Sequence, residues 1–161
     1  MPQTHLFTDK DRARSLVFRK IYFIEDTTAI ILNSHLLLEA MLYKFVQSKV
    51  VSSQFLDEAR LSFYQILNIA KSFRNENQIE QEHWMWELIE YINRLRNKLA
   101  HNITVEGIES RIEHIYKIAD YHIDIHAPGS DPSEREAKKI QYFLIILCGV
   151  VFNLDNPDFE I

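Results

Sequence analysis

Glycine and proline are scarce in this chain, and their scarcity limits the folds that it can adopt. Only three glycines and four prolines occur among 161 residues, mostly near the ends of apolar stretches. Because tight turns between strands depend on these residue types, the sequence offers little support for a sheet or a low-complexity linker. Apolar residues make up 47% of the chain, enough for one core without disulfides or a structural metal. We therefore expect a single all-α domain over residues 1–161.

The charge and the cysteine content narrow the classes of protein further. The formal net charge is −5 and the pI is about 5.8, so no general electrostatic attraction draws the chain to a polyanion, and any nucleic acid must be bound locally. Cys148 is the only cysteine, which excludes an internal disulfide and fits a buried thiol in a reducing compartment. The N-terminal segment lacks the apolar core of a signal peptide. We expect a cytoplasmic protein with no cofactor.

No segment is expected to cross a membrane, because a spanning helix needs ~20 apolar residues. The strongest candidate, residues 140–152, is shorter than that and is predicted to be a buried or subunit-contacting helix.

Hydrophobic periodicity predicts where the helices lie. The first helix should cover residues 11–48, and its second half is apolar on nearly every side, as expected of a central helix. A second helix begins after a cap at Ser52 or Ser53 and ends at the polar stretch 74–81. Further helices are expected over 79–99, from 105 onward, and from a cap at Ser133 to residue 152. Short connections favour antiparallel neighbours, hence an up-down bundle of four to five helices.

The helix over residues 79–99 can be divided into faces by its rotation of about 100° per residue. The apolar stripe that should face the core is Trp84, Leu88, Ile92, Leu95 and Leu99. The polar residues on the opposite side are Glu90, Arg94, Asn97 and His101. Arg96 lies on the flank, roughly 140° from His101, so the two converge only if the helix ends between them or a neighbour folds over. An ordinary solvated face with a Glu90–Arg94 pair is the alternative interpretation.

Two polar residues interrupt the apolar run of the first helix. His35 and Glu39 stand one turn apart among leucines and isoleucines. A carboxylate in such surroundings is seldom buried without a partner, and Arg96 or Arg94 is the candidate partner. The alternative is a narrow wet edge on which Glu39 meets solvent or Lys44.

The chain resembles the HEPN superfamily in two segments. One is the apolar helix ILNSHLLLEAMLYKF, and the other is an amphipathic helix that ends in RLRNKLAHN. The family carries an Arg-x4-6-His signature with a polar residue after the arginine. Arg96 and His101 fit the four-residue spacing, and Asn97 occupies the polar position. Arg94 with His101 fits the six-residue spacing, so the identity of the motif arginine stays open, although Asn97 favours Arg96. The resemblance covers about residues 26–123.

The resemblance implies a helical bundle that forms a homodimer, so that two copies of the motif face one cleft. Many family members are metal-independent endoribonucleases of toxin–antitoxin or antiviral defence systems. On this chain, the resemblance implies that His101 acts as general base or acid, that Arg96 holds the scissile phosphate, and that Asn97 positions both. Supporting roles would fall to Glu39, Arg94 and Lys98. The implied partners are a second copy, RNA, and an antitoxin or regulatory protein.

Two other classes of function remain open from the sequence. Where the toxin branch has a tyrosine two residues after the histidine, this chain has Ile103, and the chain also resembles mannitol-repressor-like proteins, so a noncatalytic regulatory module is one alternative. The second is an all-α, metal-dependent nucleotide pyrophosphatase, for which Glu87-Leu88-Ile89-Glu90 and Glu106-Gly107-Ile108-Glu109 supply paired carboxylates.

Two weaker patterns favour structural interpretations. His122 and His126, with Asp120 nearby, have a spacing that can hold zinc or nickel, but a surface cluster is favoured and no metal site is predicted. The aromatic residues are interpreted as core and interface, with a base-stacking platform as the alternative: Trp84, Trp86, Phe63, Tyr64, Tyr91 and Tyr142.

Overall fold

The computed structural model describes residues 9–101, 107–119, 122–123, 131, 133 and 137–155, with side chains from residue 15 onward. Within these residues the secondary structure is helical and contains no strand, which confirms the all-α prediction. The α-helices are α1 (Asp9–Ile21), α2 (Thr27–Lys49), α3 (Ser53–Glu58), α4 (Phe63–Ser72), α5 (Glu76–Gln81), α6 (His83–His101), α7 (Ile108–Ala119) and α9 (Lys139–Phe152). A short 3-10 helix, η1 (Asn153–Asp155), follows α9 directly.

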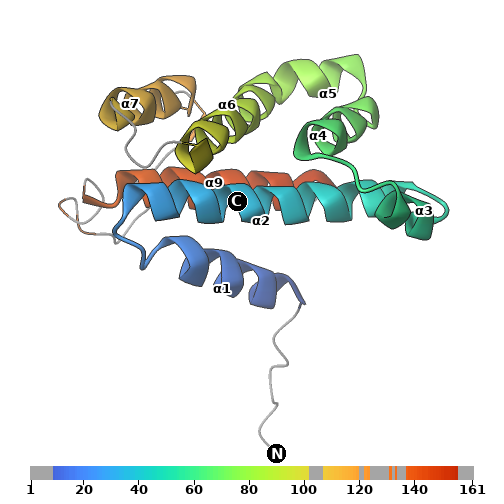
Figure 1. Ribbon diagram of the computed structural model, residues 1–161, viewed down its shortest axis with the longest axis horizontal. Helices are drawn as coiled ribbons and strands as arrows, with labels where there is room; N and C mark the ends of the chain where they lie inside the picture. The colour runs from blue at the N-terminus through green and yellow to red at the C-terminus, as the bar shows by residue number, and fades with distance from the viewer. Residues whose placement is uncertain are drawn as a thin grey trace, which may run out of the picture.

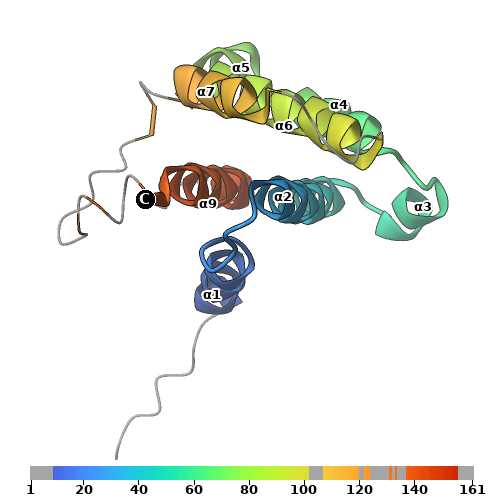
Figure 2. The ribbon, with the colours of Figure 1, turned by 60° about the vertical axis from the view of Figure 1, so that its left-hand side comes forward.

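The helices are arranged in three layers (Figures 1 and 2). Helices α2 and α9 lie side by side in the middle layer, with α4, α5, α6 and α7 on one side and α1 on the other. Helix α2 packs against α1, α4, α6 and α9, which confirms that the apolar segment 30–46 lies at the centre of the fold.

Helices α2 and α9 run in the same direction, contrary to the expectation of antiparallel neighbours. At the start of both helices, Gln141 donates from Nε2 to the Ile24 carbonyl oxygen at 3.0 Å. At their ends, Lys49 Nζ lies 2.7 Å from Asp155 Oδ1. Because contacts join the same ends of the two helices, the pair is parallel. Two parallel helices can be linked only by a long connection, and here the connection contains α3, α4, α5, α6 and α7. The sequence pattern gave no sign of this arrangement.

The predicted first helix is two helices, because the chain turns at residues 22–26. Asp26 stands in extended conformation at the N-cap of α2, and its Oδ1 accepts a hydrogen bond from Ala29 N at 2.7 Å. This bond satisfies a backbone donor that the first turn of α2 leaves free. The apolar run through Phe23 and Ile24 hides the break from a reading by periodicity alone.

The predicted second helix is also divided. Arg60 has a φ of 48°, a left-handed conformation that ends the short helix α3 and its C-cap turn. Ser62 then starts α4 with a capping box, in which the Ser62 side chain accepts from Gln65 N and the Gln65 side chain accepts from Ser62 N. The polar stretch that was expected to end this helix contains α5, capped by Asn75. The predicted end near residue 152 is confirmed, whereas residues 134–136, beside the predicted cap at Ser133, lie outside the described residues.

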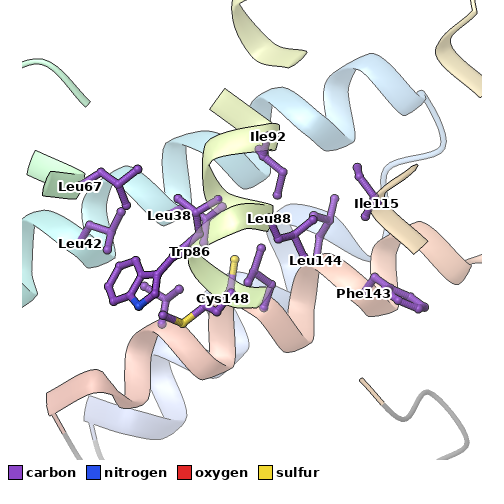
Figure 3. Packing of buried hydrophobic residues seen from close by; sticks show 14 of the residues in the cluster. Leu38, Leu42, Leu67, Trp86, Leu88, Ile92, Ile115, Phe143, Leu144 and Cys148 are labelled. Atoms are coloured by element: carbon purple, nitrogen blue, oxygen red, sulfur yellow. The ribbon is translucent and has the colours of Figure 1, made fainter. Parts of the chain in front are cut away.

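The core lies between the middle layer of α2 and α9 and the layer formed by α4, α5, α6 and α7 (Figure 3). Leu88, Ile92 and Leu95 of α6 are buried, while Trp84 and Leu99 at the two ends of the predicted stripe are half-buried. Cys148 is buried in α9 among these residues, and burial raises the pKa of its thiol to about 12. The prediction of a buried thiol is confirmed.

The expectation about membrane spans needs a correction. By length and composition, one helix in the described part of the chain, α2, is long and apolar enough to cross a membrane. The sequence reading missed it because His35 and Glu39 interrupt its apolar run. Four neighbouring helices contact α2 in the fold, so its apolar character also has a structural explanation.

Candidate site at the C-terminal half of helix α6

The second half of α6 carries the residues singled out from the sequence. Arg94, Asn97, Lys98 and the final residue, His101, are exposed, and Arg96 is half-buried. The predicted polar face is therefore confirmed, with Arg96 turned away from it. The α-helix ends at His101, so this imidazole stands at the C-terminal end of the helix dipole, where a positive charge is favoured.

Arg96 and Asn97 are in contact. The Arg96 Nη1 group donates to Asn97 Oδ1 at 3.1 Å. Asn97 also stands one helical turn before His101, on a neighbouring part of the surface. The amide therefore lies between the guanidinium and the imidazole along the helix surface. In the described part of the chain, no hydrogen bond joins His101 to either residue, so the structure connects two of the three predicted catalytic side chains.

A buried polar contact between α2 and α6 lies beside Arg96. His35 is 3% exposed, and its Nε2 lies 3.0 Å from Asn93 Oδ1. Because an amide oxygen only accepts hydrogen bonds, Nε2 carries the proton in this arrangement. His35 Nδ1 is buried and has no hydrogen-bond partner. The Phe63 ring, at the start of α4, covers the imidazole with 4.4 Å between ring centroids.

The surroundings of His35 favour its neutral form. Burial lowers the pKa of His35, and the positive charge of Arg96 lowers it further. The hydrogen bond to Asn93 and the negative charge of Glu39 raise the pKa, but they do not outweigh the burial. A lowered pKa keeps the imidazole uncharged at neutral pH. The electrostatic effects also show that Glu39 and Arg96 both lie close enough to act on the same ring. We call His35, Glu39, Asn93 and Arg96 the α2–α6 polar cluster.

The predicted direct partner of Glu39 is not observed. Glu39 is half-buried, and the ion pairs found among the described residues do not join it to Arg94, Arg96 or Lys44. Glu39 and Arg96 instead act on His35 from two helices, with the imidazole as their shared neighbour. The proposed Glu39–arginine contact is therefore wrong as a direct ion pair, and the partly wet edge describes Glu39 better.

Charged residues of the first half of α6 are paired across helices. Lys71 of α4 forms an ion pair with Glu90, which replaces the predicted Glu90–Arg94 pair. Arg74, which follows α4, holds the carboxylate of Glu82, the residue just before α6. Lys71 and Arg74 are therefore both engaged in ion pairs within the protein. Arg94 remains exposed, with its guanidinium 5.7 Å from the centre of the Tyr91 ring.

The residues proposed for metal binding are only partly described. His122 stacks on Trp84, with 5.1 Å between ring centroids and an interplanar angle of 6°. Asp120, His126 and Glu106 lie outside the described residues. Across the residues that the structure describes, no group of three or more His, Cys, Asp or Glu side chains is placed to hold a metal ion.

Sequence reasoning missed Asn93 and the surface aromatic contacts of α6. Asn93 and His35 are 58 residues apart, so only the packing of α2 on α6 brings them together. Asn93 stands one turn before Asn97, and this second asparagine on a helix with an apolar stripe was the available signal. Comparisons with family models, curated proteins and solved structures found no match to this chain.

Proposed function

We propose that this chain is a metal-independent endoribonuclease of the HEPN type that acts as a homodimer. The all-α architecture, the central apolar helix α2 and the position of Arg96, Asn97 and His101 at the end of α6 support this proposal. In this interpretation the described helices belong to a HEPN-like bundle, with α2 and α6 as its two motif-bearing helices.

The hydrogen bond from Arg96 to Asn97 is the observation that carries the proposal. The guanidinium of Arg96, a member of the α2–α6 polar cluster, is held by the neutral amide of Asn97, and this amide stands one turn from the exposed imidazole of His101. Because Asn97 contributes no charge, the positive charge of Arg96 stays available to an anion. A fixed guanidinium can donate two hydrogen bonds to a phosphate and stabilise the charge of a pentavalent transition state.

The reaction follows from these groups. His101 removes the proton from a ribose 2′-hydroxyl, and the 2′-oxygen then attacks the adjacent phosphorus. The bond from phosphorus to the 5′-oxygen breaks, and the leaving oxygen takes a proton from the imidazolium or from water. The products are a 2′,3′-cyclic phosphate and a 5′-hydroxyl. Arg96 balances the charge on the non-bridging oxygens, and Asn97 holds the guanidinium in place.

The exposed face of α2 supports the proposed homodimer. Leu36 is 59% exposed, and Ala40 is exposed one turn later on the same face. Leu32 and Tyr43 are half-buried beside them, and Glu39 of the polar cluster follows on the same side. A two-fold contact through this strip buries apolar surface on both copies and brings the two polar clusters to the same interface.

The same strip supports the second candidate, a noncatalytic module that binds a regulatory protein or an antitoxin. For the metal-dependent nucleotide hydrolase, the structure gives less support, because Lys71 occupies the carboxylate of Glu90 and Glu87 Oε2 lies 3.9 Å from His83 Nδ1. These two carboxylates are not presented to a common ligand.

The test is cleavage of a labelled single-stranded RNA by the purified protein in EDTA, with analysis of the product ends. We expect cleavage that leaves 2′,3′-cyclic phosphates and that falls by at least ~100-fold in Arg96→Ala. Arg96→Lys should recover only part of the rate, because an ammonium cannot donate in the same two-pronged geometry. Glu90→Gln should leave the rate unchanged. No cleavage by wild-type protein, or cleavage that requires magnesium and Glu90, contradicts the proposal.

A further inference from the structure

A single row of side chains runs along α6 on the side that faces α7. Its members follow one another at intervals of three and four residues: Trp84, Glu87, Tyr91, Arg94, Lys98 and His101. This spacing keeps a row on one face of a helix. Over 17 residues the row extends about 26 Å, and it ends at His101. Arg96 is not part of it.

Helix α7 lines the row in antiparallel register. His122, just after α7, stacks on Trp84. His114 of α7 contacts Tyr91 with 4.6 Å between ring centroids and an interplanar angle of 47°. The same register places Arg111 of α7 opposite Arg94. Along the interface of α6 and α7, two aromatic–histidine pairs are therefore followed by a position where two arginines face each other.

At the Trp84 end of this interface, a hollow of about 420 Å³ lies between α5, α6 and α7. Trp84, His114 and His122 line it, together with Lys117. His114 and His122 are both exposed, so a flat ligand can stack on either imidazole from the solvent side. The hollow is open to solvent along the groove and not a closed pocket.

We propose that the groove between α6 and α7 binds single-stranded RNA and leads it to His101. Bases stack on the His122–Trp84 and His114–Tyr91 pairs, and phosphates lie against Arg94 and Arg111. Aromatic platforms beside cations are the usual means of binding single strands, since every base has a π-face and every linkage carries a charge. The role of the groove as a substrate track rests on the proposed nuclease function.

The charged residues along the groove differ between its two ends. Glu80 and Glu87 line the hollow at the Trp84 end, where stacking and not charge would hold the ligand. From Tyr91 onward, the α6 row carries only basic residues: Arg94, Lys98 and His101. On α7, Glu109 and Glu113 are exposed, but their spacing places them away from the row of Arg111, His114 and His122. The positive charge therefore rises toward His101, where the cleaved linkage is proposed to lie.

Arg111 adds an independent observation. Its Nε is buried and has no hydrogen-bond partner. Buried guanidinium groups are usually satisfied, so the unpartnered Nε sets Arg111 apart from the paired arginine Arg74. Because Nε itself is shielded, a phosphate in the groove would meet the terminal nitrogens of this guanidinium.

The experiment measures RNA binding without cleavage. Fluorescence anisotropy with a labelled 12-nucleotide single strand, and with the matching duplex, is recorded in the His101→Ala background over a range of salt concentrations. The test variants add Arg94→Gln with Arg111→Gln, or His114→Ala with His122→Ala. The charge-matched control adds Arg19→Gln with Lys20→Gln, two exposed residues of α1 in the opposite layer. Arg94→Gln alone serves as a second test variant, because its side chain is exposed and its removal should not disturb folding.

We expect the arginine pair to weaken binding of the single strand about tenfold and to reduce the log–log salt slope by about 1.4. The histidine pair should weaken binding at least about fivefold through lost stacking. The α1 control should stay within about twofold of its parent, and the duplex should bind at least about tenfold more weakly.

Equal losses in the control and test variants overturn the inference, as does tighter binding of the duplex or the absence of single-strand binding. Failure of the nuclease function is distinguishable. Binding that depends on the groove, without cleavage by wild-type protein, retains the RNA track and rejects the nuclease. Cleavage that persists unchanged when the groove substitutions are made in the wild-type background, with His101 present, retains the nuclease and rejects the track.

Discussion

The two halves of α6 carry similar residue types but place their charges in different surroundings. Glu82, just before the helix, and Glu90 are held by arginine and lysine from the α4 side. In the second half, Arg96 meets a neutral amide and Arg94 lies over an aromatic ring. Within the described residues, neither arginine has a carboxylate within 4.0 Å. The carboxylates beside the first half are thus neutralised within the protein, whereas Arg94 and Arg96 meet no carboxylate among the described residues, as the proposed binding of an anion requires.

This difference arises from the neighbours and not from the helix. Arg74 and Lys71 reach the first half from the end of α4, and Trp86 Nε1 donates to Glu82 Oε2 at 3.2 Å as part of the same network. Beside the second half, α2 presents His35, whose pKa burial lowers. We therefore expect substitutions of the paired carboxylates Glu82 and Glu90 to change stability, and those in the second half to change function.

The largest effect on stability is expected at Glu82. Glu82→Gln removes the charge that faces Arg74 and weakens the acceptor for Trp86, and the pair is mostly shielded from water, with side chains 19% and 15% exposed. Removing one partner of a shielded pair leaves the other uncompensated, so we expect a loss of about 3 kcal/mol in the free energy of unfolding. Urea denaturation measures it.

Arg94→Gln is the matched control for this loss, because its guanidinium is exposed and has no carboxylate partner in the described part of the chain. Its effect on stability should stay below about 0.5 kcal/mol. Similar losses in both variants would remove the distinction between the two halves of the helix.

Substitutions of the two asparagines of α6 provide a second test of the difference between structural and functional residues. Asn93→Leu leaves the buried His35 Nε2 without its acceptor, which should cost about 1–3 kcal/mol. Asn97→Leu removes an exposed side chain and should change stability by less than about 0.5 kcal/mol, while it should reduce RNA cleavage. Parallel unfolding and cleavage assays on the two variants check both statements. A stable Asn93→Leu protein would show that the α2–α6 polar cluster contributes little to the fold.

A smaller, pH-dependent effect is expected from His35. Its pKa is lowered in the folded protein, mainly by burial, so the unfolded chain binds more protons as the pH falls below the ordinary histidine value of about 6.5. The contribution of His35 to stability is therefore present above that pH and is lost as the pH falls through the window below it. The free energy of unfolding should decline less from pH 7.5 to pH 5 in His35→Gln than in wild-type protein. Identical declines would contradict the assignment.

The sequence was sufficient to predict the local features of the fold. Apolar residues at helical spacing predicted the helical class, the buried stripe around Leu88, Ile92 and Leu95, and the exposure of Arg94, Asn97 and His101. These features depend on periodicity, which a single sequence contains. The turn at residues 22–26 was missed because apolar residues continue through it, although Asp26 was an available N-cap signal.

Long-range features could not be predicted in the same way. The parallel course of α2 and α9 depends on how the helices between them pack, and an all-round apolar helix such as α9 shows only that it is buried. The contact of His35 with Asn93 depends on the crossing of α2 and α6. The family signature selected Arg96, Asn97 and His101, and periodicity already placed Arg94 on the face of His101, but only the structure shows that Arg96 lies close to His35 of α2.

Two exposed histidines at opposite ends of α6 provide the most direct test of the central claim that the second half is the functional half. His83 and His101 are the first and last residues of the same helix. Cleavage of single-stranded RNA in EDTA is measured for His83→Ala and His101→Ala, after circular dichroism has shown that both fold. We predict that His101→Ala loses at least ~100-fold in cleavage rate, whereas His83→Ala, at a residue that lines the hollow at the far end of the groove, loses no more than about fivefold. Equal rates in the two variants, or a greater loss in His83→Ala, would contradict the account.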